Sequence, residues 1–229
     1  NIIWQKNRNK VRVVKVKSNL DEILYHKIIE SLIRGEYSVG QKILLNDLCE
    51  KFEVSRTPVV QAVKMLNKDG VLTIMTNGKV YVPEYEYDMV KQVCETRTLI
   101  ETYALEKMMQ EEEEVFQQKL DVIKRYSDKC EEYYRQEKSV ELALADLELH
   151  KAIVEGANNE ILNDVYVGIQ GRFIVVNYLI RPLKNRNYEG TVQDHFEILK
   201  FIEDRDTKKA VDKLRNHIQG TIKRFCEDE

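Results

Sequence analysis

Apolar residues recur at helical spacing through the first third of the chain and predict three helices. Leucines and isoleucines three and four positions apart indicate a first helix from about Leu20 to Arg34. Shorter patterns of the same kind indicate a second helix at about residues 46–52 and a third at about residues 57–68. Asp69 and Gly70 follow the third pattern, and this pair is typical of a helix that has just ended.

A β-hairpin is predicted directly after the third helix. Residues 71–76 and 79–82 are rich in β-branched and apolar residues. Asn77-Gly78 lies between them and is the favoured two-residue hairpin turn. Three helices followed by a hairpin predict a winged helix-turn-helix in the N-terminal part of the chain.

The rest of the chain has the pattern of a helical domain. Only 9 glycines and 3 prolines are present, too few for the many turns of an all-β fold. Apolar spacing predicts six further helices, at about residues 87–109, 111–136, 139–157, 159–180, 191–203 and 206–226. The expected fold is mainly α, with the winged helix-turn-helix over residues 1–83 and an all-α antiparallel bundle over residues 84–229. Residues 1–18 are read as either a short strand or a loose arm.

The segment between the second and third helices carries the first candidate chemistry. It reads Val54-Ser55-Arg56-Thr57-Pro58-Val59, a turn followed by a helix start. Either Ser55 or Thr57 is expected to cap the third helix, and Pro58 suits its first turn. A helix that begins this way fits a DNA major groove, where Arg56 is free to contact a phosphate or a guanine edge.

The charge divides between the two halves of the chain. Residues 1–83 hold 14 Lys and Arg against 8 Asp and Glu, a balance of +6, while residues 84–229 hold 22 against 31, a balance of −9. The sum is the net charge of −3. A basic N-terminal module suits a polyanion such as nucleic acid. The alternative interpretation is an uneven but solvated surface.

Cysteine usage and hydropathy indicate the compartment. The four cysteines are far apart and form no Cys-x-x-Cys pair, so they are interpreted as reduced, packed thiols. No apolar run approaches the roughly 20 residues that a membrane-spanning helix needs, and no signal-peptide pattern is present. We therefore expect a cytoplasmic protein with no membrane partner.

Three of the four histidines fall on apolar faces of predicted helices, whereas His26 lies off the apolar stripe of its helix. Asp146 and His150 are four residues apart and share one face, and His195 and His217 lie on the apolar stripes of two later helices. A buried carboxylate is costly unless it is paired or binds a metal. One carboxylate with three neutral imidazoles suits Zn²⁺, Ni²⁺ or a similar divalent ion. The alternative is that each histidine is a hydrogen-bonded core residue and that Asp146 pairs with one of them.

Arg97 is a second candidate for ligand binding. It lies beside the apolar face of the first helix of the acidic half, where a guanidinium needs an anion. That anion is either Glu101, one turn on, or the carboxylate of a small ligand held by two hydrogen bonds. Arg172 and Asn177, on a largely apolar helix, are candidates to line the same cavity.

The sequence resembles two known domains. The N-terminal pattern resembles the winged-helix domain of GntR-type transcription regulators, and the C-terminal pattern resembles the FCD ligand-sensing domain of the FadR-like subgroup. The resemblance covers about residues 20–226. The N-terminal match rests on Gly40, Ile43, Leu48, Phe52, Val54 to Val59, Ala62, Leu66, Gly70, Asn77, Gly78, Val80 and Val82. The C-terminal match rests on Arg97, Asp146, His150, Ala157, Asn158, His195 and His217.

This resemblance implies specific roles. It makes Asp146, His150, His195 and His217 the ligands of a divalent metal, and it places Arg97 against the carboxylate of an effector. The operator contacts that it implies come from the turn, the recognition helix and the wing, with the residues Ser55, Arg56, Thr57, Gln61, Lys64, Gly78 and Lys79. It also implies a homodimer that places two recognition helices on half-sites of a pseudo-palindromic DNA operator, about one helical turn apart.

The sequence departs from the family pattern at Val60. Relatives commonly have a basic residue directly after Pro-Val, and that residue contacts DNA. Loss of such a contact at a guanine costs about 1–3 kcal/mol or changes which base is preferred. Gln61 and Lys64 are the candidates to compensate.

The leading functional hypothesis is a DNA-binding transcription regulator, most simply a repressor. A small carboxylate or sugar acid bound over the metal would control its operator affinity. Two alternatives keep the DNA binding but make the metal purely structural, or replace it with a larger acyl-type ligand. A third is a metal-dependent hydrolase with a nucleic-acid-binding module, for which no general base stands out.

Overall fold

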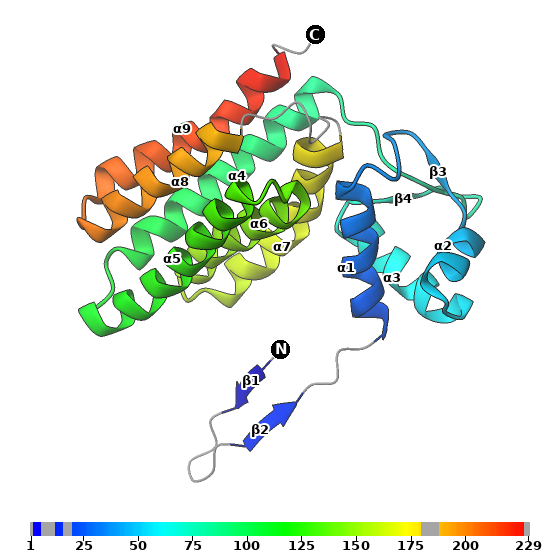
Figure 1. Ribbon diagram of the computed structural model, residues 1–229, viewed down its shortest axis with the longest axis horizontal. Coiled ribbons are helices and arrows are strands. Elements are labelled where there is room, and N and C mark those ends of the chain that lie inside the picture. Colours follow the sequence, from blue (N-terminus) through cyan, green and yellow to red (C-terminus); the bar gives the residue numbers. More distant parts are fainter. Residues whose placement is uncertain (1, 6–11, 16–19, 180–187, 227–229) are drawn as a thin grey trace.

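The computed structural model describes residues 2–5, 12–15, 20–179 and 188–226 (Figure 1). Three helices and a small sheet form one body, and a bundle of longer helices lies beside it. The predicted mainly α fold is therefore confirmed. Two strands precede these bodies, β1 (Ile2–Gln5) and β2 (Arg12–Lys15), and they pair antiparallel. They lie in the segment expected to be a strand or a loose arm, whose remaining residues are outside the described part.

The winged helix-turn-helix has the predicted three helices and one strand more than the hairpin. Its elements are, in order, α1 (Leu20–Ile33), β3 (Lys42–Ile43), α2 (Leu45–Phe52), α3 (Arg56–Lys68), β4 (Thr73–Ile74) and β5 (Val80–Tyr81). The sheet order is β3-β5-β4, with both pairs antiparallel. The strand β3 lies far from the hairpin in sequence, and its two residues are too few for a periodic pattern to reveal it.

Two local details differ from the sequence-based expectation. Ser55 is the N-cap residue of α3, but its side chain makes no capping hydrogen bond, so the prediction of a side-chain cap by Ser55 or Thr57 is wrong. The wing is also not closed by a two-residue turn. Gly78 N–H donates to Met75 O at 2.8 Å, and Gly78 is the residue with positive φ, at 77°. This is the wider hairpin turn in which a single left-handed glycine follows the turn.

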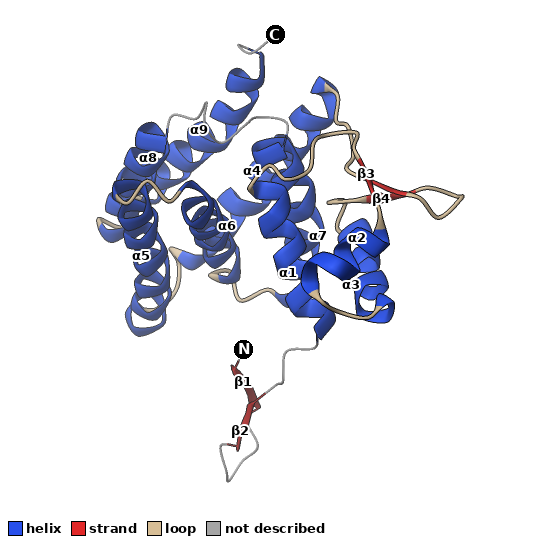
Figure 2. Cartoon of the chain, turned by 45° about the vertical axis from the view of Figure 1, so that its right-hand side comes forward, coloured by secondary structure: helices blue, strands red, loops and turns tan. Residues whose placement is uncertain are grey.

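All six predicted helices of the second body are present (Figure 2). They are α4 (Tyr87–Met108), α5 (Glu113–Arg135), α6 (Ser139–Glu155), α7 (Glu160–Ile174), α8 (Tyr188–Glu203) and α9 (Thr207–Cys226). The helix expected to run to residue 180 instead changes to a π-helical segment, η1 (Val175–Leu179). Most of the loop predicted between α7 and α8 lies outside the described residues. None of the described helices has the length and apolar character of a membrane span.

Helix α6 is buried on several sides within the bundle. Apolar residues occupy most of its surface, so it packs against neighbours on several sides. It contacts α5, α4 and α7, and two polar side chains, Asp146 and His150, are buried on it. A polar group in such a place needs partners, and here they come from α4, η1 and α8.

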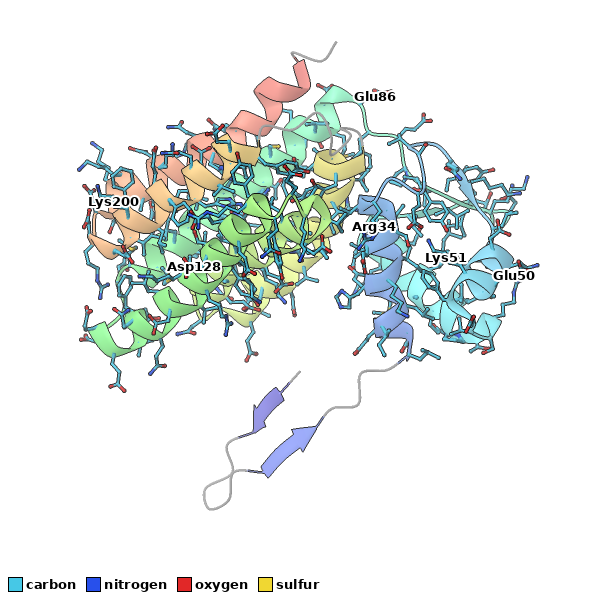
Figure 3. All side chains as sticks on the ribbon, in the orientation of Figure 1. Arg34, Glu50, Lys51, Glu86, Asp128 and Lys200 are labelled. Atoms are coloured by element: carbon cyan, nitrogen blue, oxygen red, sulfur yellow. The ribbon has the colours of Figure 1, made fainter. Side chains whose placement is uncertain are left out.

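The winged helix-turn-helix packs closely on α7. A Cβ atom added to Gly171 would lie 2.1 Å from the carbonyl oxygen of Asp69, which immediately follows α3. The Arg172 side chain lies against Gly70, and the Tyr85 hydroxyl donates to Gly70 O at 2.9 Å. Helix α1 also contacts the bundle, at η1 and α6, and Arg34, labelled in Figure 3, directly follows this helix. Because Gly171 has no side chain, the backbone of α7 can approach the backbone at Asp69 this closely.

Candidate functional site

Four buried side chains converge inside the bundle from three helices. Asp146 and His150 come from α6, His195 from α8 and His217 from α9. One nitrogen or oxygen atom of each lies within 4.8 Å of those of the others. Their exposed fractions are only 1–8 %. The structure therefore brings together all four residues that the sequence suggested as metal ligands.

The contacts within this cluster leave several ring nitrogens without a hydrogen-bond partner. Asp146 Oδ1 lies 3.2 Å from His195 Nε2 and 3.7 Å from His150 Nε2. Neither of these nitrogens has a hydrogen-bond partner among the described residues, and neither does His195 Nδ1. Buried polar atoms without a partner are rare, and a bound ion is one of the explanations for them. The set therefore fits a divalent metal better than a closed hydrogen-bonded core.

Outer contacts fix the orientation of the ligands. His150 Nδ1 lies 2.7 Å from Glu101 Oε2, and His217 Nδ1 lies 3.1 Å from Asp194 Oδ2. An ionised carboxylate can only accept, so in each neutral ring Nδ1 donates and Nε2 keeps its lone pair. Such carboxylate–histidine pairs commonly hold metal ligands in place.

Asp146 is held in a similar way. Its Oδ2 accepts a 2.7 Å hydrogen bond from the Tyr178 hydroxyl on η1, while Oδ1 faces the imidazoles. Burial alone would raise the pKa of Asp146, but the neighbouring His195 and His150 outweigh it and hold that pKa well below its ordinary value. Burial lowers the pKa of His150 and takes that of His217 to about 4. At neutral pH the site therefore presents an ionised carboxylate and uncharged imidazoles at these positions, the forms that bind metal.

Arg97 is linked to the metal candidate through Glu101, which contacts both Arg97 and His150. The residue is 3 % exposed, and its guanidinium stacks over the Phe173 ring at 3.6 Å. The Tyr166 hydroxyl donates to the same carboxylate at 2.9 Å. Of the two anions that the sequence allowed for Arg97, the structure shows Glu101. The Nη2 atom has no hydrogen-bond partner among the described residues, so part of the guanidinium is free for a second anion.

A narrow cavity adjoins this arginine. A water-sized sphere does not fit into it, so it is closed in this state. Its lining comes from α4 and α7 and consists of Val93, Arg97, Tyr166, Ile169, Gln170 and Phe173. Arg172 is not part of this lining, because its side chain lies against Gly70 and its Nη1 donates to Gly168 O at 2.9 Å. Asn177 lies on η1 and does not line the cavity either.

The DNA-contact candidates share one property, which is exposure to solvent. The turn, the recognition helix α3 and the wing present Ser55, Arg56, Thr57, Gln61, Lys64, Gly78 and Lys79. One of them is oriented by a neighbour, because Arg56 Nη1 donates to Asn46 Oδ1 on α2 at 2.7 Å. A guanidinium held from the preceding helix loses less conformational freedom on binding.

Sequence reasoning missed several residues that support these sites. Glu101 was considered only as a partner of Arg97, although it also orients His150. Asp194 directly precedes His195, and that adjacency was a usable signal. Tyr178 and Asn46 offered no pattern, because their partners are brought to them by the fold.

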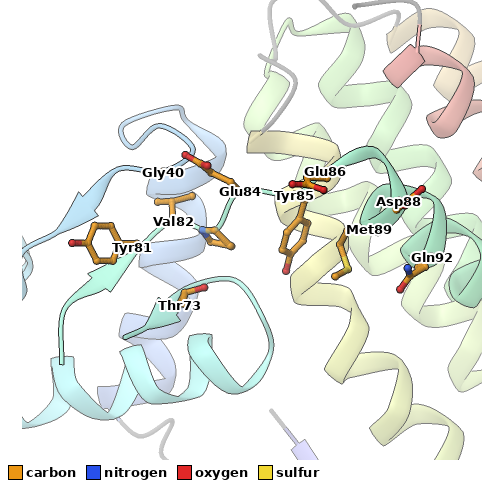
Figure 4. A pocket seen from close by; sticks show the side chains of 11 residues that line it. Gly40, Thr73, Tyr81, Val82, Glu84, Tyr85, Glu86, Asp88, Met89 and Gln92 are labelled. Atoms are coloured by element: carbon orange, nitrogen blue, oxygen red, sulfur yellow. The ribbon is translucent and has the colours of Figure 1, made fainter. Parts of the chain in front are cut away.

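A wider crevice lies elsewhere on the described surface. It has a volume of about 620 Å³ and runs from the wing to the start of α4 (Figure 4). Its lining includes the acidic residues Glu84, Glu86 and Asp88, and none of the residues predicted for DNA, effector or metal. It is open to solvent at the junction of the two bodies, and nothing in it resembles a built ligand site.

Comparison with known domains identifies both halves of the chain. The FCD domain family matches residues 92–220, which is more than half of the chain. The family described as bacterial regulatory proteins, gntR family, matches residues 20–82.

Individual relatives agree over nearly the whole length. An uncharacterized HTH-type transcriptional regulator, YdhC of Bacillus subtilis (strain 168), is 21% identical over 210 residues, covering 89% of this chain and 88% of the relative. The structure of E. coli McbR/YncC superposes with a TM-score of 0.77 at 16% identity, covering 92% of this chain and 98% of that one. A protein described as a GntR transcriptional regulator from Rhodococcus sp. RHA1 gives a TM-score of 0.76 at 16% identity, with 91% and 98% covered.

Proposed function

Because this chain belongs to the GntR family of bacterial regulatory proteins and carries an FCD domain, we propose that it is a repressor whose affinity for its DNA operator is controlled by a small carboxylate. Family membership makes it a DNA-binding transcription regulator and not an enzyme. The finer claims, repression and the class of effector, rest on the buried Asp146 and histidine cluster with Arg97 beside it.

The proposed DNA-bound form is a homodimer on a pseudo-palindromic operator. Each winged helix-turn-helix would place α3 in a major groove, with half-sites about one helical turn apart. The exposed cations of the turn and helix, Arg56 and Lys64, and the wing residue Lys79 support this orientation. The domain boundary near residues 83 and 84 remains part of the proposal.

Asp146, His150, His195 and His217 would hold a divalent ion, with Zn²⁺ and Ni²⁺ the best match for one oxygen and three nitrogen donors. When bound, the ion supplies positive charge and open coordination positions to which carboxylate oxygens bind. The four residues fix the ion in the bundle, and through it they join α6, α8 and α9 to one another.

The effector would enter next to Arg97. Glu101 already neutralises the Nε side of this guanidinium, while Nη2 is free to bind a carboxylate. The adjoining cavity is too small in this state, so a ligand must displace part of its wall. Four of the six lining residues belong to α7, which makes α7 the element that has to move.

Movement of α7 provides a route to the DNA-binding domain. Phe173 and Tyr166 face Arg97 and Glu101, whereas Gly171 and Arg172 of the same helix contact the segment that follows α3. A ligand that opens the cavity would therefore disturb the packing that orients the recognition helix. Allosteric control requires that a ligand interact differently with two states of the protein, and here those states would differ in the packing of α7 on the DNA-binding domain.

The test uses the full-length protein as purified and a duplex carrying the upstream region of its own gene. Elemental analysis and native mass spectrometry identify bound metal and any co-purified acid. The proposal expects a salt-sensitive gel shift that candidate carboxylic and sugar acids weaken. The absence of a shift, with or without added Zn²⁺ or Ni²⁺, would refute the DNA-binding claim.

The variant Arg97→Ala separates the alternatives. If the effector carboxylate binds Arg97, the variant should still bind the duplex but respond to the acid at least tenfold more weakly. An unchanged response together with a bound metal would favour a purely structural metal. A metal-free protein with a co-purified acyl compound would favour the larger ligand. Because Glu101 loses its partner in this variant, a melting curve is needed to confirm that it is folded.

A further inference from the structure

The recognition helix α3 carries one apolar side chain within its polar arc. Viewed down the axis of a helix with 3.6 residues per turn, the exposed residues of α3 lie within an arc of about 140°. Arg56 lies at one end of this arc and Gln61 at the other. Val60 falls inside this arc, between Asn67 and Lys64. The buried residues Val59, Ala62, Val63 and Leu66 occupy the opposite side.

Val60 is not one of the core residues of α3. Val59 and Val63 are 0 % and 2 % exposed and belong to the core, whereas Val60 is only partly covered and does not pack against that core. Arg56, one turn earlier, is held at the same edge of the helix by Asn46. Val60 therefore lies on the surface that would face DNA, beside an oriented guanidinium.

An apolar side chain in a major groove has one favourable partner among the base edges. The C5 methyl of thymine is apolar, while guanine, cytosine and adenine present donors or acceptors that lose water without a replacement bond. We propose that Val60 reads the methyl group of one thymine in each half-site, so that this operator has thymine where a basic residue would select guanine. This inference goes beyond the proposed function and rests on its placement of α3 in the groove.

The experiment begins by selecting binding sites from a random duplex library with the full-length protein. Each thymine of the selected duplex is then replaced by deoxyuridine, which keeps the base pair and removes only the methyl group. One thymine per half-site should prove sensitive, and its replacement should weaken binding about fourfold, the effect of one buried apolar carbon. Placing 5-methylcytosine at that position should bind more tightly than placing cytosine there.

Two variants assign the effect to the residue. Val60→Ala should bind the thymine and deoxyuridine duplexes with nearly equal affinity, and its melting temperature should match that of the parent because Val60 is outside the core. Gln61→Ala serves as the matched control. It should bind more weakly overall and retain the fourfold methyl sensitivity. Val60→Arg, selected against the same library, should replace that thymine by guanine.

The outcomes distinguish this inference from the function on which it rests. If the protein selects no sequence at all, sequence-specific DNA binding by α3 fails, and the role of Val60 fails with it. If it selects a site in which no thymine methyl matters, or if Val60→Ala keeps its methyl sensitivity, the regulator stands and the Val60 inference is overturned.

Discussion

Replacing Gly171 by alanine tests whether α7 holds the winged helix-turn-helix in place. The added Cβ would lie 2.1 Å from Asp69 O and 2.8 Å from Val71 Cγ2. A separation of 3.0 Å is the least that Cβ atoms ordinarily show, so the carbonyl must move by about 0.9 Å. The obstacle is backbone at the end of α3, which cannot turn away as a flexible side chain can.

The same helix supplies the control. Gly168 has nothing within 4 Å of its added Cβ, so Gly168→Ala should only gain the helix preference of alanine, about 1 kcal/mol. Gly171→Ala has the same gain but also the overpacking, which typically costs about 1–3 kcal/mol. For a chain of this size, that difference places its melting temperature roughly 2–12 °C below that of Gly168→Ala.

Scanning calorimetry of both variants measures the effect directly. Duplex titrations with and without an effector acid then show whether the junction transmits the response, which should be weaker in Gly171→Ala than in Gly168→Ala. Equal melting temperatures for the two variants would mean that α7 and Asp69 are not in close contact in solution. The proposed route from the cavity to α3 would then be refuted.

Three further predictions concern the metal and the DNA contact. Stripping the metal with a chelator should lower the melting temperature, and Zn²⁺ or Ni²⁺ should restore it, since an ion at 100 times its Kd stabilises by about 2.7 kcal/mol; an unchanged melt would count against a metal site. Tyr178→Phe removes the hydroxyl that holds Asp146 and should weaken metal affinity about tenfold in a competition titration, whereas equal affinity would deny it this role. Asn46→Ala frees Arg56 and should weaken duplex binding severalfold, while undiminished binding would show that the orientation does not matter.

The elements of both bodies could be predicted from local spacing. Three helices and a wing, then six helices, follow from apolar residues at helical spacing, because each helix must bury one stripe wherever it packs. Strand β3 and the π-helical segment η1 were not predictable in this way. β3 exists only through its pairing with β5, and η1 continues a helix without any break in the apolar pattern.

The metal candidates were equally visible in the sequence. Asp146 and His150 lie four residues apart, and His195 and His217 fall on apolar stripes, so burial of all four followed from helix geometry alone. What the spacing left open was whether they meet. The open nitrogens of His150 and His195 are known only from the packed bundle.

The sequence by itself determined the helices, the division of charge, the DNA-binding motif and the residue types of the site, because each depends on neighbours within a turn or two. The tertiary structure decided which groups meet. In the folded protein Arg97 pairs with Glu101, and the cavity beside it is closed. Arg172 contacts the DNA-binding domain and does not line that cavity, and Gly171 lies against Asp69. These contacts join residues on different helices, and only the packing of those helices fixes their distances.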